Sequence, residues 1–184
     1  SEIESLANSL YEKFTLRRSI RDFSERSIPQ EVINKCISVA SLAPSGANHQ
    51  PWHFVAISGK ELKTEIREAA EREETKFYAT GNNDEWLRAL EPIGTGPNKL
   101  HLERAPWLII VFAERYGVKN DGSTYKHYYV PESVGIASGF LISAIHQVGL
   151  YCLVHTPNPM KFLTKICKRP ESNKPVMILA VGHP

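Results

Sequence analysis

Four short runs of β-branched and aromatic residues constrain the fold more than any other feature of the chain. They cover residues 52–58 (WHFVAIS), 107–113 (WLIIVFA), 151–156 (YCLVHT) and 176–182 (VMILAVG). Apolar runs of this length, rich in such side chains, are typical of buried β-strands. The sequence therefore predicts a buried sheet whose strands are separated by other elements.

Helices are predicted between and before these strands, over residues 1–15, from Pro29 to about residue 40, over 60–78 and over 132–149. The last of these helices is nearly uncharged, so we expect it to be buried on several sides. Its small residues favour close approach of another backbone, and they are Gly135, Ala137, Ser138 and Gly139. The pattern leaves two interpretations open, a subunit interface or a central core helix within one chain.

The composition is that of an ordinary globular domain. The 184 residues are 42% hydrophobic and 23% charged, which predicts one domain over 1–184. A formal charge of +2 gives no support for nucleic-acid or membrane attraction. Three cysteines without CxxC spacing indicate neither a disulfide framework nor a zinc site, and no apolar run is long enough to span a membrane. We expect a cytoplasmic protein.

The segment from about 78 to 100 mixes Gly and Pro with a short amphipathic piece around Trp86. Such a segment within a compact domain is typical of a lid over a binding site. Seven scattered histidines without metal-ligand spacing give little support for a metal centre.

Three arginines and a serine stand together in LRRSIRDF, namely Arg17, Arg18, Ser19 and Arg21. Their donors suit a tetrahedral phosphate, and the flanking apolar residues would fix them to the fold. The alternative is a basic surface turn paired with Asp22 or Glu25. Nucleotide-binding loops of the GxGxxG and GxxxxGK types are absent from the sequence. A second feature, APSGANHQPW over 43–52, offers backbone donors at a turn after a helix, and alone it is weak evidence.

The segments RRSIRDF, APSGANHQPW, YYVPESVGIASGFLISAIHQVGL and VMILAVGHP, in this order and spacing, resemble the nitroreductase family of FMN flavoproteins. The resemblance covers nearly the whole chain. It implies an α+β three-layer sandwich with a central mixed or antiparallel sheet, and an intertwined homodimer with FMN sites at the interface. It also implies that Arg17, Arg18, Ser19 and Arg21 hold the FMN phosphate.

Within that family the sequence is similar to the iodotyrosine deiodinases. This similarity implies that Pro44, Ser45 and Gly46 reach the flavin from the partner subunit. It implies main-chain contacts with the flavin from Val154 and His155, and a hydrogen bond from the Thr156 hydroxyl to flavin N5. A donor at N5 would stabilise the one-electron reduced flavin, which gives Thr156 a catalytic role.

The same similarity implies a clamp for the zwitterion of a halotyrosine, made by Glu74, Tyr78 and Lys99. Glu74 and Tyr78 are four residues apart and so share a helix face, whereas Lys99 follows the lid segment. The Ala47 N–H would hold the phenolate oxygen. The alternative interpretation is that Glu74 belongs to a solvated charge run, EREETK, and that Lys99 is a surface residue.

The similarity therefore implies an FMN-dependent reductive dehalogenase acting on halotyrosines such as 3-iodotyrosine, with NAD(P)H or a reductase as electron donor. The membrane anchor of the animal deiodinases has no counterpart here, so we expect a soluble, bacterial-type protein. A general NAD(P)H-dependent nitroreductase or flavin reductase is the alternative enzyme, and an FMN-binding module without turnover is an alternative of another class. Glu74, Tyr78, Lys99 and Thr156 distinguish these possibilities.

Overall fold

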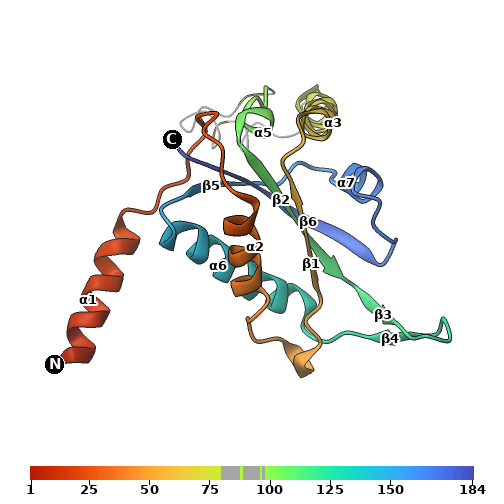
Figure 1. The fold of residues 1–184 in the computed structure, drawn as a ribbon. Helices are drawn as coiled ribbons and strands as arrows, with labels where there is room; N and C mark the ends of the chain where they lie inside the picture. The colour runs from red at the N-terminus through yellow and green to blue at the C-terminus, as the bar shows by residue number, and fades with distance from the viewer. Residues whose placement is uncertain (80–87, 89–95, 97) are drawn as a thin grey trace.

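Four antiparallel strands form the central sheet of the computed structural model, which describes residues 1–79, 88, 96 and 98–184. The order across the sheet is β1, β2, β6, β5, so the two longest strands occupy its centre (Figure 1). All three pairings are antiparallel. The predicted strands are confirmed as β1 (Trp52–Ile57), β2 (Trp107–Glu114), β5 (Tyr151–His155) and β6 (Asn173–Gly182).

Strand β2 is buried on both faces, which explains its unbroken apolar sequence. Side chains alternate along a strand, so Leu108, Ile110 and Phe112 enter one core and Ile109 and Val111 enter the other. Each buried side chain of this size stabilises the fold by about 1.5–3 kcal/mol. The strand therefore joins two hydrophobic cores, one on each face of the sheet.

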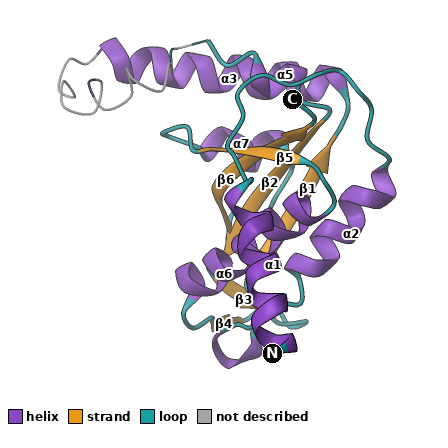
Figure 2. Ribbon diagram, turned by 90° about the vertical axis from the view of Figure 1, so that its left-hand side faces the viewer, coloured by secondary structure: helices purple, strands orange, loops and turns teal. Residues whose placement is uncertain are grey.

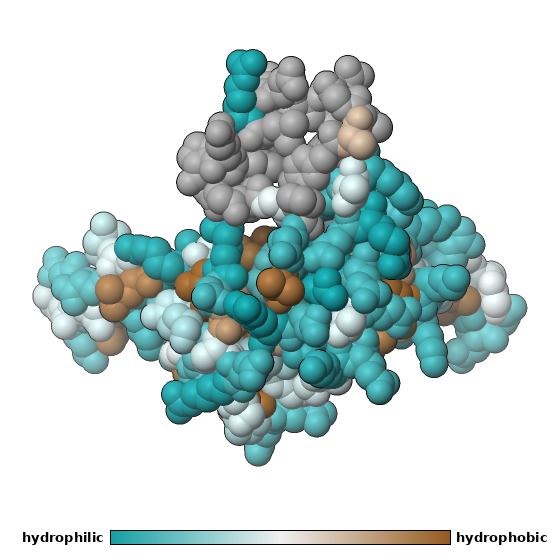
Figure 3. Space-filling model, turned by 90° about the horizontal axis from the view of Figure 1, so that it is seen from above, coloured by the Kyte–Doolittle hydropathy of each residue, from teal (hydrophilic) through white to brown (hydrophobic). Residues whose placement is uncertain are grey.

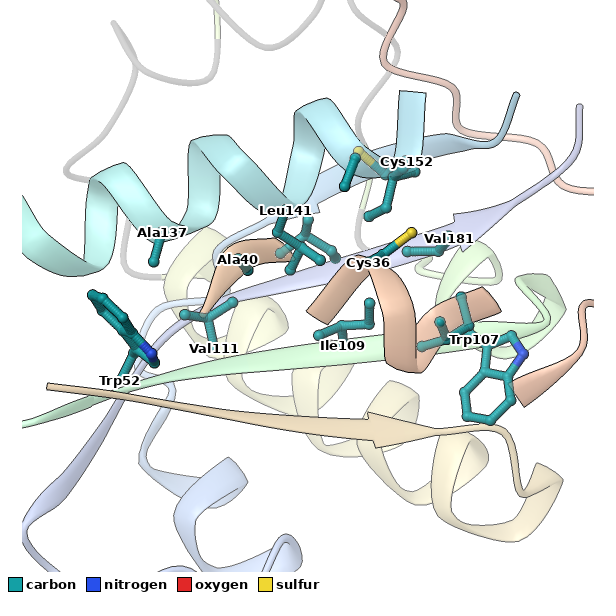
Figure 4. Packing of buried hydrophobic residues seen from close by; sticks show 14 of the residues in the cluster. Cys36, Ala40, Trp52, Trp107, Ile109, Val111, Ala137, Leu141, Cys152 and Val181 are labelled. Atoms are coloured by element: carbon teal, nitrogen blue, oxygen red, sulfur yellow. The ribbon is translucent and has the colours of Figure 1, made fainter. Parts of the chain in front are cut away.

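Helices cover both faces of the sheet and complete three layers (Figures 1 and 2). Helices α2 (Gln30–Ala40) and α6 (Val130–Gln147) pack on one face, and Figure 4 shows Cys36, Ala40 and Leu141 from them around Ile109. Helices α3 (Lys60–Ala79), α5 (His101–Arg104) and α7 (Lys161–Ile166) supply the core of the opposite face. The α+β three-layer sandwich is confirmed, with a sheet that is antiparallel throughout.

Helix α1 (Glu2–Thr15) forms as predicted, yet none of its residues is buried. Its contacts with the body lie at its C-terminal end. The Lys13 carbonyl accepts from His146 Nε2 at 2.8 Å, and the Phe14 ring meets the His146 ring edge to face. The apolar stripe of the helix, Ile3, Leu6 and Leu10, is exposed, and apolar atoms are visible at the α1 end of the molecule in Figure 3.

Helix α6 is a core helix, which is one of the two interpretations that its sequence left open. One face, including Ala137 and Leu141, lies in the core against β2 and α2. The opposite face exposes Ile136 and Phe140, and a side-chain carbon added at Gly135 or Gly139 would meet nothing within 4 Å. The helix is thus a core helix with an open apolar face.

The sequence pattern did not predict the short elements. A two-stranded hairpin, β3 (Tyr116–Val118) with β4 (Thr124–Lys126), turns at Gly122, whose φ of +84° lies in the left-handed region that glycine tolerates. Strand β6 begins three residues before the predicted start at Val176. Pro175 is accommodated there because it lies at an irregularity of the β2–β6 pairing, before the stretch that pairs with β5.

Most of the predicted lid segment, residues 80–87, 89–95 and 97, lies outside the described residues. Among the helices of the described ranges, none is long and apolar enough to cross a bilayer. The three cysteines, Cys36, Cys152 and Cys167, are free thiols.

Candidate functional site

The arginine–serine motif lies beside the free edge of β5. After α1 ends, the chain contacts the sheet through an isolated parallel bridge between Ser19 and Cys152 of β5. This bridge brings Arg17 to Arg21 next to the strand that ends at His155, immediately before Thr156. Two motifs more than 130 residues apart in the sequence therefore share one edge of the molecule.

No carboxylate among the described residues lies within ion-pair distance of Arg17, Arg18 or Arg21. Asp22 instead pairs with Arg104, at 3.3 Å. The Arg18 guanidinium turns back and donates to the carbonyls of Thr15 and Arg17, at 2.6 and 2.8 Å. Within the described part of the chain, the positive charge of the cluster is therefore uncompensated, and Arg18 and Arg21 are exposed. The donors of the cluster fit a phosphate group, as the phosphate hypothesis requires.

A cavity of about 300 Å³ opens beside this motif. Arg21 lines it from the N-terminal segment, Val154 and His155 line it from β5, and Lys99 and His101 line it from the start of α5. The cavity therefore collects a predicted cofactor-binding arginine, the predicted main-chain contacts and one member of the predicted clamp.

Glu74 and Lys99 form a buried ion pair, with 2.7 Å between Glu74 Oε2 and Lys99 Nζ. Glu74 is 9% exposed and Lys99 is 4% exposed, so neither is the solvated surface residue of the alternative interpretation. Buried charges of opposite sign are costly to desolvate and stay buried only when paired. Lys99 lines the cavity and Glu74 lies directly behind it, and one anion and one cation side by side at a cavity are suited to a ligand that carries both charges.

Two imidazoles lie beside this pair. Burial, with the nearby charges of Lys99 and Arg21, lowers the pKa of His101 to about 4. Burial, with Lys99 and His101, lowers the pKa of His155 to about 3. The two rings meet edge to face, with centroids 5.3 Å apart. Both histidines are therefore neutral at neutral pH, so the charged side chains that line the cavity are Lys99, which is paired with Glu74, and Arg21.

An ion-pair network between α3 and α5 fixes the backbone of Lys99. Arg67 lies 2.7 Å from Glu71 Oε2 and 2.7 Å from Glu103 Oε2, which ties the two helices together. The other oxygen of Glu71 accepts the Lys99 N–H at 2.8 Å. Sequence reasoning missed Glu71, although its three-residue spacing from Glu74 places both on one face of α3.

The turn with Pro44 to Ala47 is built to present its backbone. Gly46 donates its N–H to Ser133 Oγ at 3.1 Å, and a side-chain carbon on Gly46 would lie 2.6 Å from the Tyr128 carbonyl oxygen. Ala47 is exposed and has φ 49°, a left-handed conformation that is strained for alanine. Ser45 Oγ accepts from the Gln50 N–H at 2.9 Å and closes the turn.

This turn lies far from the arginines within one chain. Gly46 contacts Ser133 near the start of α6, whereas Ser19 pairs with Cys152 beyond the end of that helix. An α-helix of 18 residues is about 27 Å long. Figure 1 shows the turn beside β3 and β4, at the end of the fold opposite β5. One chain therefore contributes the two motifs to different places.

Two further predicted site residues, Thr156 and Tyr78, are located by their positions after β5 and in α3. Thr156 is exposed directly after β5, next to the cavity-lining His155. Tyr78 lies in α3 one turn after Glu74, and its side chain is outside the described residues. No group of three or more potential metal ligands occurs in the described ranges.

Comparisons with known proteins extend over the whole chain. A family model described as the nitroreductase family matches residues 15–183. The chain is 50% identical over 183 residues to a protein named iodotyrosine deiodinase from Haliscomenobacter hydrossis, and the match covers 100% of this chain and 82% of that protein. It is 40% identical over 184 residues to a protein of the same name from Hydra vulgaris, covering 100% of this chain and 68% of that protein.

Solved structures agree with the fold. A crystal structure of oxidized iodotyrosine deiodinase bound to FMN and 3-iodo-L-tyrosine superimposes with a TM-score of 0.82 at 33% identity, covering 95% of this chain and 89% of that chain. A BluB-like flavoprotein from Clostridium difficile 630, at 21% identity and a TM-score of 0.74, shares the fold. Because a family model matches residues 15–183 and relatives well above 30% identity match over the whole of this chain, the chain belongs to the nitroreductase family.

Proposed function

We propose that the protein is an FMN-dependent oxidoreductase that reductively dehalogenates halotyrosines such as 3-iodotyrosine. The observation that carries the proposal is the buried Glu74–Lys99 pair beside the cavity, because a general nitroreductase has no need of a zwitterion clamp. The name of the 50% identical relative, and the FMN and 3-iodo-L-tyrosine in the 33% identical structure, support the same function.

In this proposal the arginine cluster holds the FMN phosphate. Arg17, Arg18 and Arg21 supply charge without a competing carboxylate among the described residues, and Ser19 adds a hydroxyl and an N–H beside β5. Val154 and His155 would contact the flavin through their main chain, since the end of β5 lines the cavity.

The clamp would bind the amino-acid part of the substrate. The Glu74 carboxylate would accept hydrogen bonds from the α-ammonium, and Lys99 would donate to the α-carboxylate. Each charge would thus keep a partner of opposite sign when the Glu74–Lys99 ion pair opens. Tyr78, one helical turn from Glu74, would add a hydroxyl to this clamp. The Ala47 N–H, presented by the left-handed turn, would donate to the phenolate oxygen.

Reduced FMN, when bound, supplies the two electrons that, with a proton, replace the carbon–iodine bond by a carbon–hydrogen bond and release iodide. The chain's own part is to orient and to donate hydrogen bonds. Thr156 would donate its hydroxyl to flavin N5, and its position directly after the last paired residue of β5 limits its movement. The donor that reduces the flavin is NAD(P)H or a reductase protein.

The proposal includes a homodimer in which Pro44, Ser45, Gly46 and Ala47 of one chain complete the site of the other. The distance between that turn and the arginines within one chain supports it. So do the exposed apolar residues of α1 and α6, and an apolar groove of about 440 Å³ between α2 and α6, lined in part by Val39, Phe140 and Val148. Exposed apolar side chains that line a groove are typical of an interaction surface.

Two further expectations belong to the same proposal. Residues 1–184 form one FMN-binding domain, and the segment 78–100 closes over the bound halotyrosine as a lid. Closure would exclude water from the reacting groups. The compartment we propose is the cytoplasm, on the support of the three free thiols.

Titration of the FMN-loaded protein with 3-iodotyrosine, followed by flavin fluorescence, tests the clamp. Glu74→Gln and Lys99→Ala should each weaken binding at least about tenfold, because each leaves a buried charge without its partner. Matched controls on the same helix are Glu73→Gln and Lys76→Ala, a pair 3.1 Å apart in which Lys76 is exposed and Glu73 is partly exposed, and these changes should alter binding little.

A simple 2-iodophenol, which carries neither charge, is the ligand control. If wild type binds it as tightly as 3-iodotyrosine and no clamp variant matters, the dehalogenase proposal fails and a general nitroreductase replaces it. A protein that takes up FMN but shows no reduction of any substrate would instead be a flavin-binding module.

A further inference from the structure

The Glu74 carboxylate has a different neighbour at each oxygen. Oε2 lies 2.7 Å from Lys99 Nζ, and Oε1 lies 3.4 Å from His155 Nε2. The side chains of Glu74 and His155 are each 11% exposed, so water is largely excluded from the contact. In the proposed function Lys99 binds the substrate through its side chain, whereas His155 contacts the flavin only through its main chain. The imidazole of His155 therefore has no role in the proposed function.

The imidazole is poised to donate one hydrogen bond. A neutral imidazole carries a proton on one nitrogen, and a neighbouring carboxylate favours the tautomer that places it on the facing nitrogen. His155 Nε2 is buried and has no hydrogen-bond partner among the described residues. The 3.4 Å separation from Glu74 Oε1 is long for a hydrogen bond, and such contacts commonly shorten when a ligand binds.

Both the backbone and the ring of His155 are held in place. His155 is the last residue of β5 and pairs with Ile178 of β6. The ring of His101 packs edge to face against its ring at 72°. A donor fixed in this way can hold a carboxylate in one orientation.

We propose that His155 is a positioning residue for Glu74, whose carboxylate it holds by a hydrogen bond from Nε2 to Oε1 in the orientation that accepts the substrate's ammonium. The inference rests on the proposed function. A neutral donor suits this role better than a cationic one, because it orients the carboxylate without cancelling the negative charge that the ammonium meets. His155 would thus act on the amino group of the substrate and not on its phenol ring.

The test compares His155→Leu and His155→Gln in FMN-loaded protein titrated with 3-iodotyrosine and, separately, with 2-iodophenol. His155→Leu removes the donor and should weaken 3-iodotyrosine binding about tenfold while changing 2-iodophenol binding less than about twofold. His155→Gln keeps an N–H donor on a side chain of similar reach and should restore most of the loss. His53→Leu, a half-buried histidine on the far edge strand β1, is the matched control and should leave both affinities unchanged.

The outcomes separate this inference from the proposed function. If wild type prefers 3-iodotyrosine and His155→Leu keeps the full preference, the positioning role is wrong and the proposed function stands. If His155→Leu loses both ligands equally, the imidazole is only structural, which also overturns the role. If wild type itself shows no preference for 3-iodotyrosine, the proposed function fails and the inference fails with it. Should His155→Leu not fold, His155→Asn, whose amide is too short to reach Glu74, takes its place with the same expected loss.

Discussion

At the scale of single residues, His101 and His155 make the stability of the fold depend on pH. Their pKa values in the folded chain, about 4 and about 3, lie below the value of about 6.5 expected in the unfolded chain. Between these values the unfolded state binds more protons than the folded state, so protonation favours unfolding. Burial of the two neutral imidazoles therefore costs no stability above about pH 6.5. The free energy of unfolding decreases as pH falls from there toward the pKa values of the folded chain, about 4 and about 3.

We therefore expect the free energy of unfolding, measured by urea titration, to fall between pH 7 and pH 5. In His101→Phe, which keeps an aromatic ring against His155, the fall should be smaller because one titrating group is gone. An equal fall in wild type and variant would show that other groups dominate in this pH range.

Glu74 shows how far single residues could be predicted from the sequence. Its charge run reads as a solvated helix face, and only the resemblance to the family singled it out. The helical period explains the outcome, since Glu71 and Glu74 share a helix face and both contact Lys99, whereas Arg72 between them is exposed. The side-chain role of His155 had no signal at all, because its contact with Glu74 joins a strand end to a helix 81 positions earlier. Tertiary contacts of this kind have no periodic signature.

At the scale of elements, the η1 turn (Gly46–Asn48) depends on its contact with the start of α6. Gly46→Ala would place a carbon 2.6 Å from the Tyr128 carbonyl oxygen and 3.0 Å from Tyr129 Cβ. A carbonyl oxygen and a Cβ atom cannot rotate away as the end of a flexible side chain can, so the backbone of the turn must move to make room. We expect a loss of about 1–3 kcal/mol in the free energy of unfolding, and weaker FMN binding.

Urea denaturation and FMN titration measure the two effects of Gly46→Ala. Gly59→Ala is the control, since an added carbon there meets nothing within 4 Å. A Gly46→Ala protein as stable as wild type, with unchanged FMN affinity, would contradict the close packing of this turn.

The longer elements were the predictable ones. All four strands and the helices α1, α2, α3 and α6 follow from apolar runs or from helical spacing. The hairpin β3–β4 and the helices α5 and α7 did not, since strands of three residues and helices of four to six residues contain too little pattern. Their positions depend on packing against longer elements, as when α7 inserts Leu163 into the core shared with α3.

At the scale of the whole molecule, each FMN site of the proposed dimer is built from residues of two chains. We expect the mass of a dimer in solution by light scattering. Phe140→Asp places a charge on the open face of α6 and should give monomers that lose FMN, because the turn at Pro44–Ala47 then cannot complete the partner's site. Phe140→Leu, which keeps the face apolar, should behave as wild type. A Phe140→Asp monomer that retains FMN would contradict the shared site.

The central claim is that this site removes halide from halotyrosines by reduction. The direct measurement is anaerobic reaction of the chemically reduced, FMN-loaded protein with 3-iodotyrosine, with tyrosine and iodide quantified together. We predict one tyrosine and one iodide for each reduced flavin, and loss of this reaction in Glu74→Gln at the same substrate concentration. If the reduced protein converts a nitroaromatic compound but forms no tyrosine from 3-iodotyrosine, the claim is wrong and the cavity serves a general reductase.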